Sequence, residues 1–239
     1  MFEVLLLATT LAANLDPAAL LQTADAPRQA FLHSIVRVRA TTTEPGQPAH
    51  SGEFDLYLGN EDQQLVVFRD KHNKGRKFVM QGDKAWLIVP GSAHAIAVTP
   101  GQRMFGAMSY TDIARVRLAR DYTGRLRPGM APCGEPAQPC RVLDITASVK
   151  TAPYASGTLW IDGEGLLRKA VFALASGKPA KEITYRYTET PDGKPVPSGL
   201  TLVDLLLPDK TARTNLEYLR RQPAELPAST FDPTRQLKR

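Results

Sequence analysis

The chain has 239 residues, of which 43% are hydrophobic and 23% are charged, a balance that is ordinary for a globular protein with a sizeable core. Its net charge of +6 raises nucleic acid as a partner, but Lys and Arg are spread along the sequence without a basic helix or an aromatic-basic ribbon. We therefore expect no nucleic-acid binding, and a basic surface that faces an anionic membrane or an acidic partner is at least as natural.

Residues 1–14 form an apolar N-terminal segment. Its apolar run, which begins at Val4, is too short to cross a bilayer. The run is followed by small residues, as in a secretory signal that would be cleaved at Ala12 or Ala13. However, the basic start of such a signal is missing, and Glu3 lies where Lys is usual. We interpret the segment as the remnant of a signal peptide, with an uncleaved apolar segment as the alternative, and we expect export.

The next residues predict a helix followed by several strands. Asp16 and Pro17 suit the N-cap and the first position of a helix. Residues 51–58 alternate between apolar and polar side chains, as a half-buried strand does. Further strand signals lie at residues 36–43, 65–68 and 76–81.

A short helix is expected to interrupt the strands near the middle of the chain. Residues 85–89 and 95–98 predict two strands of a hairpin. Ser109 and Asp112 then give a helix-start signal, from which we expect an apolar-faced helix over residues 113–118. A helix inserted among antiparallel strands suggests an element that lies across a sheet as a cover or a plug.

A Gly- and Pro-rich stretch at residues 123–139, which we expect to be a loop, contains Cys133 and is followed directly by Cys140. Cys133 and Cys140 are too far apart for a redox CxxC motif, and no third Cys or His is near enough to complete a metal site. A local disulfide is the interpretation for an exported protein. Two free thiols are the alternative for a cytoplasmic one.

From Arg141 onward nearly every segment has the pattern of a strand. The chain has no alternation of helices and strands, no repeat and no interdomain linker. We therefore predict a mainly β (α+β) fold, in which about ten or eleven strands form a single curved antiparallel sheet. Residues 15–239 are expected to form one domain.

No set of residues predicts catalysis. The sequence lacks the GxSxG, P-loop and GxGxxG motifs, and the histidines His33, His50, His72 and His94 lie in different segments. Asp204 lies within an apolar strand, where it would be either a functional carboxylate or a paired charge of the core. We predict that the protein is not an enzyme and needs no cofactor or metal.

The positive signal is an excess of apolar residues on the sheet. Residues 200–207 are apolar on both faces apart from Asp204 and need cover on both sides. If the few short helices cover only the concave face, an apolar pocket remains beneath them. The flexible side chains of Met80, Met104 and Met108 would suit its lining, with ordinary core as the alternative.

The order of several short segments resembles the outer-membrane lipoprotein-sorting (LolA/LolB-like) family over roughly residues 17–235. These segments are Gly82-Asp83 with Trp86 and Pro90, Arg103-Met104-Phe105-Gly106, Gly157-Thr158-Leu159-Trp160-Ile161-Asp162, Gly177-Lys178-Pro179-Ala180-Lys181 and Phe231-Asp232-Pro233. The resemblance implies an incomplete antiparallel barrel whose helices form a lid over an apolar cavity. It also implies a monomeric periplasmic carrier of lipoprotein acyl chains or other lipid-like cargo, which an inner-membrane donor supplies and an outer-membrane acceptor receives.

The resemblance also implies which residues hold the cargo. The expected residues of the cavity and lid are Met80, Trp86, Ile88, Met104, Phe105, Met108, Ile113 and Trp160. One departure from the family is that the Arg that helps to hold its lid shut has no counterpart in residues 52–60, where Asn60 is the nearest candidate. A divergent paralogue for another hydrophobic cargo is therefore expected, and a module that docks a membrane-protein partner is the alternative.

Overall fold

The computed structural model describes residues 15–29, 31–71, 73–99, 103–109, 112, 116–207 and 212–237. Its helices are α1 (Pro17–Gln29), α3 (Leu118–Asp121), the 3-10 helix η1 (Ala228–Phe231) and α4 (Pro233–Leu237). Its strands are β1 (Ser34–Thr43), β2 (His50–Leu58), β3 (Gln63–Phe68), β4 (Lys77–Gln81), β5 (Lys84–Ile88), β6 (Ile96–Ala97), β7 (Arg103–Phe105), β8 (Met108–Ser109), β9 (Tyr122–Cys133), β10 (Gln138–Ala147), β11 (Ser156–Ile161), β12 (Leu167–Ala173), β13 (Pro179–Glu189), β14 (Pro195–Asp204) and β15 (Arg213–Pro223). The possible signal segment, residues 1–14, lies outside the described residues.

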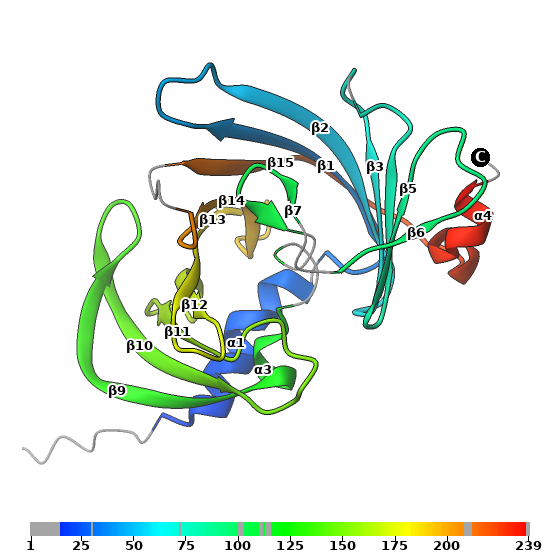
Figure 1. Ribbon diagram of the computed structural model, residues 1–239. Coiled ribbons are helices and arrows are strands. Elements are labelled where there is room, and N and C mark those ends of the chain that lie inside the picture. The colour runs from blue at the N-terminus through cyan, green and yellow to red at the C-terminus, as the bar shows by residue number, and fades with distance from the viewer. Residues whose placement is uncertain are drawn as a thin grey trace, which may run out of the picture.

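One antiparallel sheet of 13 strands organises the molecule, in the order β6-β5-β4-β3-β2-β1-β15-β14-β13-β12-β11-β10-β9. The sheet curves around α1 without closing into a barrel, because β6 and β9 remain as its two edges (Figure 1). Neighbouring strands are also neighbours in sequence, except where β1 pairs with β15 and joins the two ends of the chain. The predicted open antiparallel half-barrel is confirmed, although it has more strands than the ten or eleven expected.

Alternation along the strands places the main core on the concave face of the sheet. On β1 the buried residues Val36, Val38 and Ala40 alternate with more exposed side chains. Leu21 and Ala24 of α1 belong to the same core. Asp16 caps this helix by accepting a hydrogen bond from the N–H of Ala18 (3.0 Å), as the sequence predicted.

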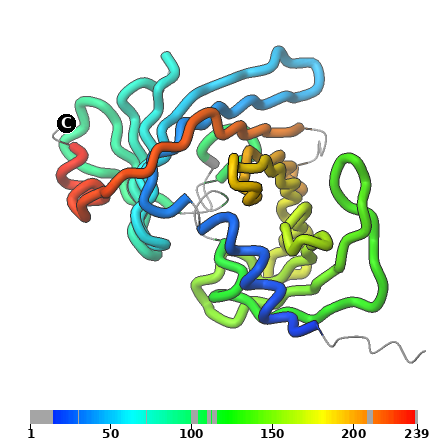
Figure 2. Tube along the Cα trace, turned by 180° about the vertical axis from the view of Figure 1, so that it is seen from behind, coloured from blue at the N-terminus to red at the C-terminus, as the bar shows by residue number. Residues whose placement is uncertain are grey.

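A second, smaller core lies on the convex face. It joins Leu65, Val79 and Ile88 of β3, β4 and β5 to Phe231 of η1. The C-terminal helices therefore cover this end of the sheet from outside, far from α1 (Figure 2). Strands buried on both faces explain the continuous apolar run of β4.

The prediction of a loop over residues 123–139 is wrong, because β9 occupies residues 122–133 and pairs with β10. The two prolines of β9, Pro128 and Pro132, disfavour a strand in general, since proline has no N–H to donate. At a sheet edge this loss is tolerated, and β9 is the edge strand. The ladder also shifts its register opposite Arg141 to Leu143, so Pro128 lies in an unpaired bulge.

The helix expected over residues 113–118 is confirmed only in part, because Asp112 and Leu118 are helical whereas residues 116–117 are not. Residues 103–109 form the small antiparallel hairpin β7–β8. Gly106 turns it with a φ of +53°, a left-handed conformation that glycine adopts at little cost. The helix α3 begins at Leu118, and residues 113–115 lie outside the described residues.

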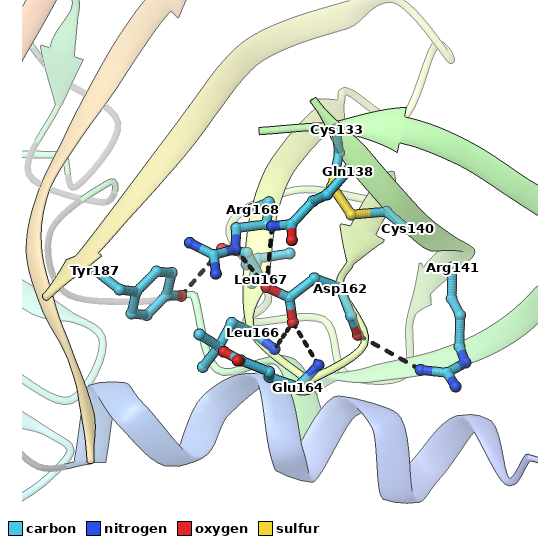
Figure 3. Close-up of a disulfide and its surroundings, with 10 residues drawn as sticks. All are labelled: Cys133, Gln138, Cys140, Arg141, Asp162, Glu164, Leu166, Leu167, Arg168 and Tyr187. Atoms are coloured by element: carbon cyan, nitrogen blue, oxygen red, sulfur yellow. Dashed lines mark hydrogen bonds and ion pairs between the residues drawn. A yellow bond between two sulfur atoms is a disulfide. The ribbon is translucent and has the colours of Figure 1, made fainter. Parts of the chain in front are cut away.

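The two cysteines form the predicted disulfide, Cys133–Cys140, between β9 and β10. Beside it lies the buried carboxylate of Asp162 (Figure 3). Asp162 accepts hydrogen bonds from the N–H groups of Glu164 and Leu166, both at 2.9 Å, and pairs with Arg168. These contacts fix the turn between β11 and β12 beneath the disulfide.

Removing the disulfide is expected to loosen this end of the sheet. Its cysteines are 7 positions apart, and closing so short a loop in the unfolded chain corresponds to about 2.5 kcal/mol. We expect the double variant Cys133→Ser, Cys140→Ser to lose about that much free energy of unfolding in urea denaturation. A loss well below 1 kcal/mol would show that pairing with β10 holds β9 without the disulfide.

Candidate functional site

A cavity of about 180 Å³ lies on the concave side of the sheet. Its walls come from the end of α1, the strands β1 to β3 and β13 to β15, and the segment that precedes and includes α3. The apolar part of the wall is formed by Phe31, Val36, Leu56, Leu58, Val116, Pro197 and Leu200. This combination of an apolar wall with a few polar groups is typical of binding sites for small molecules.

The polar part of the wall is centred on Arg28, close to the end of α1. Its Nη1 atom is buried without a hydrogen-bond partner, and the nearest carboxylate oxygen, Oδ1 of Asp25, is 3.6 Å away. Tyr185 of β13 and Tyr218 of β15 belong to this part of the wall, together with Asp25, Gln29, Glu61, Gln64, Asp112, Arg117 and Arg120. Burial raises the pKa of Tyr218 to about 12 and also raises that of Tyr185, so both side chains are neutral hydroxyls at physiological pH.

Asp25 links α1 to α3 across the cavity. Its Oδ2 accepts the N–H of Ala119 at 2.8 Å, one of the unpaired donors in the first turn of α3. Burial raises the pKa of Asp25, although Arg28 and the helix N–H groups oppose this rise. The carboxylate therefore positions α3 over the cavity.

We call the described residues 103–109, 112 and 116–121 the lid segment, because they lie over the concave face of the sheet (Figure 1). The hairpin β7–β8 is fixed to the sheet by Thr214, whose hydroxyl accepts the N–H of Ala107 at 2.8 Å. Thr214 is also 3.1 Å from the hydroxyl of Thr42, so β1 and β15 both hold the hairpin.

A buried group of charges fixes the other end of the hairpin. Lys181 of β13 lies 3.6 Å from a carboxylate oxygen of Asp112 and 3.6 Å from one of Asp204, and it donates to the carbonyl of Ala107. Asp112 also accepts the Tyr154 hydroxyl at 2.7 Å. Of the two interpretations of Asp204 from sequence, the contacts support a paired charge of the core. Lys181 thus links Asp112 and the hairpin β7–β8 to β13 and β14.

Replacing Gly106 is expected to lift the lid segment from the sheet. A Cβ at this position would be 2.1 Å from Oγ1 of Thr42 and 2.4 Å from Oγ1 of Thr214. We expect Gly106→Ala to lose 1–3 kcal/mol or more from backbone strain and to raise the fluorescence of an added apolar dye. Gly46 is a matched control, because its φ of +72° carries the same strain but no atom lies within 4 Å of its Cβ position. Equal dye fluorescence for Gly106→Ala and Gly46→Ala would contradict a displaced lid.

None of the seven predicted cargo residues that the structure describes lines this cavity. Met80, Phe105 and Met108 are buried in the main core, and Met104 packs against it. Ile113 lies outside the described residues.

The other three predicted cargo residues lie away from the concave face. Ile88 is buried in the convex-face core, and Trp86 packs against the same cluster. Trp160 is half-buried on β11, with Lys169 5.4 Å from the centre of its ring. A cargo role for any of these residues remains a prediction.

The sequence analysis missed the polar residues of the cavity. Arg28, Tyr185 and Tyr218 lie on three separate elements that only the curvature of the sheet brings together. The one available signal was Lys181, a charged residue that alternates into the apolar face of β13 as Asp204 does in β14.

Comparisons with known proteins extend over most of the chain. A family model described as an uncharacterized protein matches residues 60–239. A search of curated proteins finds no significant match.

Several solved structures share the fold. A LolA superfamily protein from Nitrosomonas europaea is 21% identical, with a TM-score of 0.77 over 91% of this chain and 97% of that one. A putative outer membrane lipoprotein-sorting protein domain from Vibrio parahaemolyticus is 15% identical, with a TM-score of 0.74 over 93% and 98% of the two chains. A DUF1329 family protein from Desulfovibrio piger is 18% identical, with a TM-score of 0.72 over 91% and 98%. The chain therefore belongs to the family described as an uncharacterized protein, and it has the LolA-like fold.

Proposed function

We propose that the protein is a carrier that binds the acyl chain of a lipoprotein, or another lipid-like molecule, and delivers it through the periplasm towards the outer membrane. The observation that carries this proposal is the apolar cavity enclosed by the concave sheet, α1 and the lid segment. The similarity to the Vibrio parahaemolyticus domain, which is described as an outer membrane lipoprotein-sorting protein domain, supports the same class of cargo. An inner-membrane donor and an outer-membrane acceptor would complete the route.

Binding and release explain this function without a covalent step. Each methylene group that moves from water into the apolar wall contributes about 0.8 kcal/mol. A cavity of about 180 Å³ is smaller than the roughly 300 Å³ of a small ligand site, so it would have to widen to hold a whole acyl chain. Loading a whole acyl chain requires the lid segment to move. No helix among the described residues has the length and apolar character needed to span a membrane.

Uptake of a neutral apolar dye by delipidated protein tests the proposal. We expect saturable binding of N-phenyl-1-naphthylamine and its displacement by dodecanol, a ligand with an uncharged head. Native mass spectrometry of protein purified from its own envelope fraction should also show a bound lipid-like species. Absence of both dye uptake and co-purified lipid would exclude a carrier.

A substitution that partly fills the cavity, compared with the same substitution at an exposed position, tests whether the dye binds in the cavity. Leu200 lies in the cavity wall, and Leu200→Trp would fill part of the space. We expect this variant to bind the dye at least about tenfold more weakly, which corresponds to about 1.4 kcal/mol. Leu174 is 38% exposed beyond the end of β12, so Leu174→Trp should bind like the parent chain. Circular dichroism of both variants checks that they are folded.

A further inference from the structure

The guanidinium of Arg28 is incompletely satisfied within the cavity wall. Its Nη1 atom is buried without a hydrogen-bond acceptor, although a buried donor normally has one. The closest carboxylate oxygen, on Asp25, is 3.6 Å away and beyond hydrogen-bond distance. The side chain of Arg28 as a whole is 24% exposed, which places this group where the cavity meets solvent.

Two further donors lie in the same wall. Within the described part of the chain, the hydroxyls of Tyr185 and Tyr218 make no hydrogen bond to another protein group, and both tyrosines line the cavity. Burial keeps both hydroxyls protonated at neutral pH, since it raises the pKa of each. Arg28 and these tyrosines therefore offer hydrogen-bond donors from three different elements.

Several other charged groups of the wall have hydrogen-bond or ion-pair partners. The Oδ2 atom of Asp25 accepts the N–H of Ala119. Asp112 is paired with Lys181. Arg117 also has a buried Nε atom without a hydrogen-bond partner, but its Nη1 atom donates to Asp62. Among the described residues, the guanidinium of Arg28 makes no hydrogen bond to another protein group, so a ligand acceptor would satisfy it.

We propose that the cavity receives the anionic head group of a lipid-like molecule on Arg28, with the apolar tail against Leu56 and Leu200. This inference rests on the proposed carrier function and adds the chemical class of its cargo. A carboxylate or a phosphate supplies the missing acceptor, and a guanidinium binds either through charge-assisted hydrogen bonds. The two tyrosine hydroxyls are placed to donate to the remaining oxygen atoms.

Ligands that differ only in the head group test this assignment. Dodecanoate, dodecyl phosphate and dodecanol each compete with N-phenyl-1-naphthylamine for the delipidated protein. We expect at least one of the two anions to bind about tenfold or more tightly than dodecanol, as expected for hydrogen bonds to a charged group. The tighter of the two anions identifies the head group as a carboxylate or a phosphate.

Two substitutions of Arg28 and one control assign the preference to this residue. Arg28→Met should bring the anions to the affinity of dodecanol without weakening dodecanol itself, and Arg28→Lys should keep part of the preference. Arg125 on β9 is 87% exposed, so Arg125→Met should retain all of it. The head-group assignment is overturned if the parent chain binds all three ligands equally, or if Arg28→Met keeps the preference. If none of the three ligands binds, dodecanol included, the result would instead overturn the proposed carrier function.

Discussion

Lys181→Met is expected to lower the free energy of unfolding by 3–5 kcal/mol, because it leaves two buried carboxylates without their shared cation. The side chain of Lys181 is only 7% exposed and lies between those of Asp112 and Asp204, which are 1% and 7% exposed. Water therefore cannot replace the ammonium group. Urea denaturation followed by tryptophan fluorescence measures the loss.

Two comparisons separate this charge effect from a general effect of the substitution. Lys178 is exposed in the turn before β13, and Lys178→Met should change the free energy of unfolding by less than about 0.5 kcal/mol. Adding Asp112→Asn and Asp204→Asn to Lys181→Met should regain part of the lost stability, since the uncompensated charges are then gone. A triple variant that is less stable than Lys181→Met alone would show that hydrogen bonds of the carboxylates, and not their charges, dominate.

Phe172→Ala is expected to cost 3–5 kcal/mol, as for other buried phenylalanine side chains. Phe172 of β12 is fully buried in the main core and stacks on the ring of Tyr154, with ring centres 4.8 Å apart. Tyr154 in turn donates its hydroxyl to Asp112 in the lid segment. The loss of packing should therefore be accompanied by stronger binding of an apolar dye at the loosened lid.

Graded substitutions at this position test the packing argument. Phe172→Leu retains much of the volume and should lose clearly less stability than Phe172→Ala. Leu174→Ala, two residues further along at a 38% exposed position, should lose no more than about 0.5 kcal/mol. Similar losses for Phe172→Leu and Phe172→Ala would show that ring stacking matters more than the filled volume.

The fold class was predictable from sequence because it depends on local alternation. The periodic burial of β1 and β2 and the start of α1 at Pro17 are local patterns that survive in the structure. The strand β9 was missed because its Gly and Pro residues favour a loop in isolation. Only its position at the edge of the sheet makes a strand acceptable there.

The candidate site was far less predictable, since it depends on contacts between distant segments. Met80, Met104 and Met108 were chosen for the flexibility of their side chains, but the structure places them in or against the core. Arg28 and Tyr218 meet only because β1 pairs with β15, which brings the two ends of the chain together. No pattern within a short window contains that information.

The prolines of β9 have a second consequence, for the behaviour of the protein at high concentration. An open sheet exposes unpaired backbone groups at both edges, where a second copy can add its own strand and begin an aggregate. Pro128 and Pro132 interrupt one edge, and β6 limits the other to the two residues Ile96–Ala97. The sheet can therefore remain an unclosed half-barrel without exposing a long edge strand to a second copy of the chain.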